Sequence, residues 1–331
     1  MKNEHRITYM GTPEFAATIL GKLIESGIYK PGLVITQPDK PVGRKQALTL
    51  PPVKTLAEAN GISVWQPKNL KDPEIIQKIR DEKPDLILVA AYGKIIPQEV
   101  LDIPRFGALN IHGSLLPLLR GASPVQTAIL EGHRETGPTI MVVDAELDHG
   151  PVLAQEAFPI VPDDTAVTLM RKMAEAGADL LLKTLPLWLE EKIKPIEQEH
   201  AKATLTKIFQ KEDGEIKPEM TAEYIERMTR AFDPWPGVFI KFKVQSLKLK
   251  VEEEKILKII KARVISCERE NLPSMSFFVT KDKQLALKTA KDCLILETVQ
   301  PEGKKPMSGC DFYLGNKNLI LTQDSASKHI W

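Results

Sequence analysis

The residues in this sequence with the clearest potential for chemistry are an asparagine, a histidine and an aspartate. Asn110 and His112 stand two positions apart at the end of an apolar run, and Asp148 follows in a later loop. Side chains at positions i and i+2 of a strand point to the same face, so we expect the amide and the imidazole side by side. The amide could donate to an oxyanion, the imidazole could move a proton, and the carboxylate could orient or charge the imidazole. Such a set suits acyl transfer.

Taken alone, these three residues also fit a plainer interpretation. Asn110 could cap a turn, His112 could be a satisfied buried imidazole, and Asp148 could be an ordinary turn residue before a glycine. The surrounding sequence has to decide between the two.

A nucleotide-binding turn is a weaker candidate. Gly11-Thr12-Pro13 follows the first expected strand and opens a helix, with Thr12 as the expected cap and Pro13 at the first helical position. The turn has one glycine where the dinucleotide fingerprint has three, and Pro13 removes a backbone donor. We therefore exclude NAD binding here.

The first half of the chain alternates strand and helix, and so supplies the scaffold for Asn110 and His112. We expect strands at 6–10, 33–36, 64–65, 86–91 and 108–112, and helices at 13–27, 53–60 and 75–81. Continuous apolar strands with intervening helices are typical of a doubly wound, mostly parallel, Rossmann-like sheet in the α/β class. Ligands bind such sheets beyond the carboxyl ends of the strands, where strand order reverses. Asn110 and His112 stand at such an end.

The second half has a different pattern. Residues 165–191 read as one long helix, interrupted or kinked at Pro186, and the polar stretch 192–211 reads as a linker. After a helix at 221–232, short β-like runs follow at 238–242, 246–251, 259–265, 276–279, 285–289 and 293–299, which suggests a small barrel. We therefore expect a catalytic domain at 1–191, a linker at 192–211 and a barrel domain at 212–331.

Bulk composition fits a two-domain globular protein of 331 residues, with 43% hydrophobic and 27% charged side chains. No apolar run reaches membrane-spanning length, and the amino terminus does not resemble a signal peptide. Cys267, Cys293 and Cys310 are far apart, without a C-x-x-C motif or a neighbouring histidine, so we expect neither a disulfide framework nor a zinc site. A reducing cytoplasm is the default location.

The net charge of +1 conceals an asymmetry between the two halves. Residues 1–201 carry 22 basic and 26 acidic side chains, whereas residues 202–331 carry 23 basic and 18 acidic ones. A basic second domain hints at a polyanionic partner, although lysines on a solvated barrel surface explain the difference equally well.

Long segments of the chain resemble the folate-dependent formyltransferases. The segments are NIHGSLLPLLRGASPVQ (110–126), TGPTIMVVDAELDHG (136–150), MGTPEFA (10–16), TQPDKP (36–41) with Gly43-Arg44, RAFDPWPG (230–237) and QPEGKKPM (300–307). The last four are similar to the branch of that family that acts on initiator methionyl-tRNA. The resemblance covers residues 6 to about 312 and implies that the second domain is an OB-like β-barrel.

The resemblance also implies roles for particular residues. Asn110, His112 and Asp148 would be catalytic, and folate would bind against Ser114, Leu115, Leu116 and Pro117 and against Ala91, Tyr92 and Gly93. The loop 37–50 would contact tRNA through Arg44 and Lys45, and Lys304 and Lys305 could extend that basic track. The family's usual Leu-Asp-Thr-Gly-Asp pattern is altered here, because His149 and Pro151 replace its third and fifth residues.

These implications lead to one expected function. The protein would transfer a formyl group from 10-formyltetrahydrofolate, its co-substrate, to the amino group of initiator methionyl-tRNA, as a cytoplasmic monomer without a metal or a membrane partner. A formyltransferase for an amino-sugar nucleotide or another small amine is the alternative, against which the loop 37–50 and the basic second domain speak. A tRNA-binding protein without catalysis would leave Asn110, His112 and Asp148 unexplained.

Overall fold

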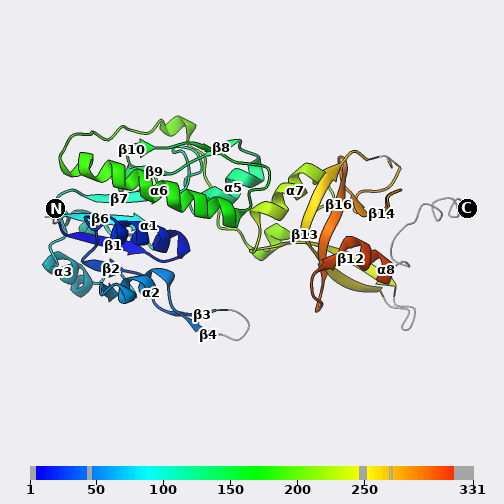
Figure 1. Ribbon diagram of the computed structural model, residues 1–331, viewed down its shortest axis with the longest axis horizontal. Coiled ribbons are helices and arrows are strands. Elements are labelled where there is room, and N and C mark those ends of the chain that lie inside the picture. Colours follow the sequence, from blue (N-terminus) through cyan, green and yellow to red (C-terminus); the bar gives the residue numbers. More distant parts are fainter. Residues whose placement is uncertain (1–4, 43–46, 246–251, 268, 270, 317–331) are drawn as a thin grey trace, which may run out of the picture. The chain divides into compact units, whose positions relative to one another are not determined.

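The computed structural model describes residues 5–42, 47–245, 252–267, 269 and 271–316, and the chain forms two compact units (Figure 1). The first unit comprises residues 1–125, 134–160 and 168–207, and the second comprises 126–133, 161–167 and 208–331. Residues 192–207, for which the sequence indicates only a linker, therefore belong to the first compact unit. Across the described ranges, no helix is long and apolar enough to cross a membrane.

A seven-stranded sheet forms the centre of the first unit. Its first five strands run parallel, in the order β5 (Ser63–Trp65), β2 (Leu33–Ile35), β1 (Ile7–Gly11), β6 (Leu86–Ala90) and β7 (Ala108–His112). Antiparallel β9 (Thr139–Val142) and β10 (Val152–Gln155) extend the β7 edge. Every residue of β1, β2 and β6 is buried, which explains why their sequences are apolar except for Thr8. The strand order reverses between β1 and β6, so the carboxyl ends of these strands flank the switch point.

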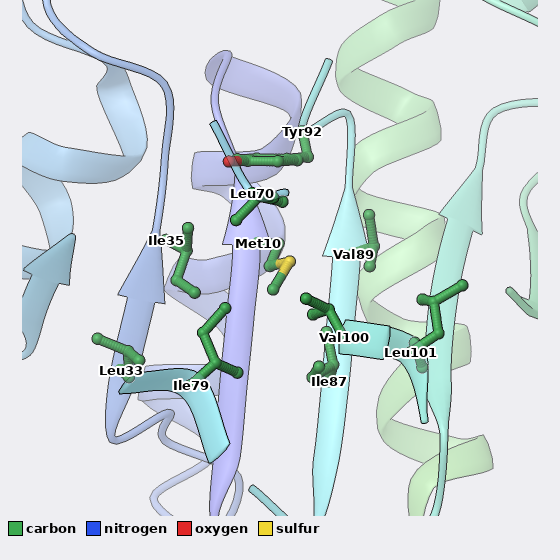
Figure 2. Close-up of a cluster of buried hydrophobic side chains, with 11 residues drawn as sticks. Met10, Leu33, Ile35, Leu70, Ile79, Ile87, Val89, Tyr92, Val100 and Leu101 are labelled. Atoms are coloured by element: carbon green, nitrogen blue, oxygen red, sulfur yellow. The ribbon is translucent and has the colours of Figure 1, made fainter. Parts of the chain in front are cut away.

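Helices cover both faces of this sheet, as the doubly wound prediction requires. On one face, α3 (Pro73–Asp81) and α4 (Gln98–Leu101) pack on a buried apolar cluster that Figure 2 shows from Leu33 across to Leu101. On the other face, the Tyr9 hydroxyl donates to the Ala16 carbonyl of α1 (Glu14–Glu25), 2.6 Å away. The long helix α6 (Ala166–Leu189), with Pro186 inside it, lies so close to β7 that a Cβ at Gly177 would be 2.9 Å from Ile111.

The remaining elements of the first half are short. They are α2 (Pro52–Ala59), α5 (Pro124–Glu131), the paired strands β3 (Lys40–Val42) and β4 (Ala47–Thr49), the paired strands β8 (Glu135–Thr136) and β11 (Phe158–Pro159), and the 3-10 turn η1 (His200–Lys202).

The start of α1 differs from the prediction. Pro13 is the N-cap residue, and no side chain caps the helix. The Thr12 hydroxyl instead donates to the Tyr92 carbonyl, at 3.0 Å. Thr12 therefore joins the turn after β1 to the turn after β6, across the switch point, and the prediction that it caps the helix was wrong.

In its described residues, the second unit contains an antiparallel sheet, most of α5 and two further helices. Its strands lie in the order β12 (Val238–Gln245), β13 (Glu252–Ile265), β16 (Cys293–Pro301), β15 (Leu285–Lys288) and β14 (Phe277–Val279), and β17 (Met307–Ser308) also pairs with β16. The two further helices are α7 (Ala222–Ala231), which Thr221 caps as its N-cap residue, and α8 (Gly309–Gly315), and the turn η2 (Lys211–Gly214) precedes them.

This sheet curls into a half-barrel, which agrees with the expected barrel class. Phe242 of β12 and Phe277 of β14 come from opposite edges of the sheet, yet their ring centroids lie 5.7 Å apart. The strand expected at 246–251 lies outside the described residues.

A disulfide in the second unit contradicts the expectation from cysteine spacing. Cys267 and Cys293 are bonded, although 26 positions separate them in the sequence. The antiparallel register explains the pairing, because Ile265 at the end of β13 faces Cys293 at the start of β16. Strand register, which spacing alone does not reveal, brings the two thiols together. Cys310 is free and exposed.

Candidate active site

Strand β7 places Asn110 and His112 on one face of the sheet, close to its carboxyl end. Asn110 lies between Val89 of β6 and Met141 of β9, and His112 faces Thr139 of β9. Ile111, between them, points to the opposite face and packs near α6. The expected same-face arrangement of the amide and the imidazole is therefore present, one strand away from the switch point.

Asp148 reaches these two side chains from the loop between β9 and β10. Its Oδ1 atom lies 3.4 Å from Asn110 Nδ2 and 3.5 Å from His112 Nδ1, and its Oδ2 atom accepts a 2.8 Å hydrogen bond from the Gly121 backbone. The side chains of His112 and Asp148 are only 6% and 11% exposed. Charges and dipoles of such buried side chains interact more strongly than they would in water.

The second ring nitrogen of His112 fixes its tautomer. Nε2 lies 3.0 Å from the Leu119 carbonyl, which can only accept a hydrogen bond, so Nε2 carries a proton. Nδ1 is then the nitrogen that faces the carboxylate of Asp148 and can exchange a proton in that direction.

The segment Ser114–Pro117, expected to bind folate, is a tightly bonded turn beside His112. The buried Ser114 hydroxyl donates to the Leu118 carbonyl at 2.6 Å. Thr139 Oγ1 donates to the Ser114 carbonyl and accepts from the Leu116 amide, while Gln155 Nε2 donates to the Leu116 carbonyl. The side chain of Ser114 therefore shapes the turn, and Leu115 and Pro117 retain partly exposed surface.

The second expected folate segment, Ala91–Gly93, follows β6 beside the end of β7. The Tyr92 carbonyl accepts from Thr12 and from Gln37 Nε2, and a Cβ at Gly93 would lie 2.4 Å from that Gln37 nitrogen. Gly93 also has φ of +78°, a backbone conformation that favours glycine.

The phenol of Tyr92 points into the apolar cluster instead of the site. Figure 2 shows its ring at the end of the cluster nearest the carboxyl ends of the strands. Burial raises the pKa of Tyr92 to about 12. Only the backbone of this residue and the exposed Ala91 and Gly93 can therefore line a ligand site.

Sequence reasoning missed a group of residues that surrounds the Asp148 loop. Gln198 and His200 come from the segment 192–207, and both bond to Arg120. In the same segment, Thr204 Oγ1 accepts from the Leu119 amide at 2.8 Å, and the backbones of Arg120 and Thr204 are bonded at 2.9 Å. The polar, aperiodic sequence of 192–207 carries no signal for these contacts.

The residues expected to bind tRNA are only partly described. Arg44 and Lys45 lie outside the described residues, whereas Lys304 and Lys305 have exposed side chains in the turn between β16 and β17. The base of the loop 37–50 is well bonded. Lys54 donates to both oxygens of Asp39, and Gln66 donates to Asp39 and to the Gln37 carbonyl. Hydrogen bonds from Gln66 and Lys54 hold the pKa of Asp39 below its usual value.

The arrangement can stabilise a developing oxyanion and move a proton. Asn110 supplies an amide donor, and the pair formed by His112 and Asp148 supplies a site for a proton. Among the described residues, no group of three or more His, Cys, Asp or Glu side chains is placed to hold a metal ion.

Both halves of the chain are similar to known formyltransferases. Residues 5–185 match the family model described as formyl transferase, and residues 208–317 match the one described as formyl transferase, C-terminal domain. The methionyl-tRNA formyltransferase of Roseiflexus castenholzii is 44% identical over 310 residues, which cover 94% of this chain and 96% of that protein. The methionyl-tRNA formyltransferase of Myxococcus xanthus is 39% identical over 312 residues, which cover 94% and 95%.

Solved structures share the fold at lower identity. An N-formyltransferase from Helicobacter canadensis, in complex with folinic acid and dTDP-3-aminofucose, has a TM-score of 0.62 at 19% identity and covers 90% of this chain and 99% of its own. HypX from Aquifex aeolicus, in complex with tetrahydrofolic acid, has a TM-score of 0.60 at 18% identity. That match covers 94% of this chain and 47% of HypX, so this chain spans about half of HypX.

Proposed function

This chain belongs to the family of methionyl-tRNA formyltransferases, and on that premise we propose that its site around Asn110, His112 and Asp148 formylates initiator methionyl-tRNA. The enzyme transfers a formyl group and uses a folate-type co-substrate, for which we propose 10-formyltetrahydrofolate. The observation that carries the assignment to this site is the approach of the Asp148 carboxylate to both Asn110 and His112 at the carboxyl end of β7.

The reaction requires one bond to form and one to break. The amino nitrogen of the methionyl group attacks the formyl carbon, and an electron pair moves onto the formyl oxygen. When the tetrahedral intermediate collapses, the bond between the formyl carbon and the folate nitrogen N10 breaks. N10 takes up a proton, and the amino group loses one.

We assign the stabilisation of the oxyanion to the Asn110 amide. A preorganised donor of this kind contributes about 3 kcal/mol to lowering the barrier. An α-amino group titrates near pH 8, so part of it is already neutral at neutral pH and no strong base is needed. The proton that it loses on attack would pass to His112 Nδ1 or to Asp148 Oδ1, which lie 3.5 Å apart.

The two turns that flank these residues would bind the folate. Ala91 and Gly93 would present their backbone on one side, and Leu115 and Pro117 their partly exposed side chains on the other. Ser114, Leu116 and Tyr92 would hold these two turns in shape, because their polar groups or rings are already engaged within the fold.

The polyanionic acceptor would bind to basic side chains in both halves of the chain. We propose Arg44 and Lys45 in the loop 37–50, and Lys304 and Lys305 in the turn after β16, as contacts to tRNA phosphates. We further propose that the enzyme acts in the cytoplasm as a monomer, with the first compact unit as the catalytic domain and the second compact unit as the tRNA-binding domain.

Formylation of charged tRNA tests this function directly. The purified protein is incubated with 10-formyltetrahydrofolate and initiator methionyl-tRNA, and formylmethionine is released from the tRNA and quantified. We expect rapid formylation that is lost when the tRNA is uncharged. Consumption of the donor only when an amino-sugar nucleotide replaces the tRNA would retain the folate site and overturn the proposed acceptor.

A further inference from the structure

We propose that Gln198 is a positioning residue that holds the Asp148 loop in its reactive conformation, with Arg120 and His200 as its supports. This inference rests on the proposed function of the site and extends it to a segment for which the sequence indicated only a linker.

Gln198 uses the full bonding capacity of its side chain. Its Oε1 atom accepts from Arg120 Nε at 3.1 Å and from Arg120 Nη2 at 2.7 Å. Its Nε2 atom donates to the Asp148 carbonyl at 3.0 Å and to the Gly150 carbonyl at 2.7 Å. A guanidinium can only donate and a carbonyl can only accept, so these partners allow a single orientation of the amide. Gln198 is 6% exposed and Arg120 is 7% exposed, so water cannot readily replace these bonds.

The loop needs such support because Asp148 has an unfavourable backbone conformation. Its φ of +48° lies in the left-handed region, which costs an L residue about 1 kcal/mol or more. Gly150 passes so close to β9 that a Cβ would lie 2.0 Å from the Val142 carbonyl. Gln198 binds the carbonyls on both sides of His149 and thereby holds this strained turn on the sheet.

His200 and His149 add a second connection between the same two segments. Arg120 Nη2 donates to His200 Nδ1 at 2.8 Å, and the His200 ring stacks on the His149 ring with 4.1 Å between centroids and 5° between planes. His149 Nδ1 lies 2.7 Å from Asp144 Oδ2, at the other end of the loop. Arg120 therefore supports both the amide and the imidazole that contact the loop.

The position of the loop determines where the Asp148 carboxylate lies. Its Oδ1 atom is 3.4 Å from Asn110 Nδ2 and 3.5 Å from His112 Nδ1, so a small rotation of the turn would separate it from both. Misplacement of a reacting group by about 1 Å can reduce a rate about 10²-fold. Because Gln198 bonds to Arg120 and to the loop backbone, its loss should reduce kcat and leave the KM values for tRNA and folate nearly unchanged.

Two substitutions of different chemistry test the proposal. Gln198→Met keeps the length of the side chain and removes all four bonds. Gln198→Glu keeps an acceptor for Arg120, but an ionised carboxylate cannot donate to the carbonyls of Asp148 and Gly150. We expect both variants to lower kcat by about 10²-fold while KM changes by less than about twofold. Gln77→Met on the exposed face of α3 is the matched control and should behave as wild type.

A double-mutant cycle separates positioning from general stability. If Gln198 acts through Asp148, then Gln198→Glu should cause little further loss in an Asp148→Ala background. Losses that multiply, or a Gln198→Glu variant with wild-type kcat, would overturn the proposal. Should Gln198→Met fail to fold, as judged by circular dichroism, Gln198→Glu and the cycle still decide the matter. Wild-type enzyme is assayed in parallel, and its failure to formylate methionyl-tRNA would instead overturn the proposed function.

Discussion

Asp148 is the residue on which the contacts of the candidate site converge. Its carboxylate faces Asn110 and His112 and accepts from the Gly121 amide, while its carbonyl accepts from Gln198. Contacts from β7, from the turn at Gly121 and from the segment around Gln198 thus meet at one residue. The geometry explains why a left-handed backbone is maintained there in a residue other than glycine.

Removal of the amide or the carboxylate should affect the chemical step. We expect Asn110→Ala and Asp148→Ala each to slow single-turnover formylation by at least about 10²-fold, because each removes a group that we propose contacts the reacting atoms. Affinity for tRNA should stay nearly constant, as measured by filter binding. A rate close to that of wild type would exclude the substituted residue from the catalytic set.

Tyr92 gives a prediction about stability and pH. Its hydroxyl has no hydrogen-bond partner among the described residues, and burial raises its pKa to about 12. In the unfolded chain the phenol ionises near pH 10, so the contribution of Tyr92 to stability is complete below about pH 10 and is lost as the pH rises towards 12.

The substitution Tyr92→Phe removes this titration and the unpaired hydroxyl. The variant should be at least as stable as wild type at pH 8 in urea unfolding, and its advantage should grow as the pH rises from 10 to 11. An advantage that does not change with pH would show that the phenol is not held in its neutral form.

At this scale the sequence predicts some residues and not others. The strand period of two places Asn110 and His112 together, and the motif around Asp148 supplies the third group. The contact of Gln198 with Asp148 could not be predicted, because 50 positions separate the two residues. The residues around Gln198 are polar and show no helical or strand periodicity. Only the path of the chain after α6 brings Gln198 to the site.

At the scale of single elements and loops, the loop 37–50 leads to the clearest functional prediction, which concerns the binding of tRNA. Its base is fixed by Lys54 and Gln66, which hold Asp39, and hydrogen bonds from Gln66 and Lys54 keep the pKa of Asp39 low. The base should therefore remain bonded across the neutral range, because Asp39 loses its charge only as the pH falls through that lowered pKa.

Arg44→Ala tests the proposed contact of this loop with a tRNA phosphate. We expect weaker binding of tRNA and a reduction of about one in the slope of log K against log salt. The same measurement on Lys30→Ala, an exposed lysine that bonds to the Asn60 carbonyl, serves as the control. An unchanged slope in Arg44→Ala would remove Arg44 from the proposed tRNA contacts.

Buried strands are the elements that the sequence predicts best. The strand 108–112 has the predicted bounds, β2 and β6 each end one residue earlier than predicted, and β1 is shifted by one residue at both ends. Continuous apolar runs in the sequence predict such buried strands. The bond between Cys267 and Cys293 escaped prediction because it depends on the register of β13 against β16, which no local pattern encodes.

For the whole molecule, the first compact unit extends to residue 207. Residues 192–207 pair with the unit at two places, where Ile196 bridges Val152 and Leu205 bridges Arg120. Each backbone hydrogen bond of this kind contributes about 1 kcal/mol. The segment should therefore contribute to the stability of the unit as well as to its site.

Two truncated chains test this contribution. The fragments 1–207 and 1–191 differ only in residues 192–207. The difference between their melting temperatures therefore reports the contribution of that segment. We expect the fragment 1–191 to melt about 5 °C or more below the fragment 1–207 by circular dichroism. Equal melting temperatures would show that the segment adds no net stability.

Residues 192–207 contact the candidate site but are synthesised after it, and this order affects how the site forms during translation. A ribosome extends the chain from the amino terminus at roughly 5–20 residues per second, and domains begin to fold as they emerge. Asn110, His112 and Asp148 leave the ribosome well before Gln198, whose amide binds the carbonyls of Asp148 and Gly150. The nascent enzyme therefore carries all three proposed catalytic side chains before Gln198 can hold the Asp148 loop in place.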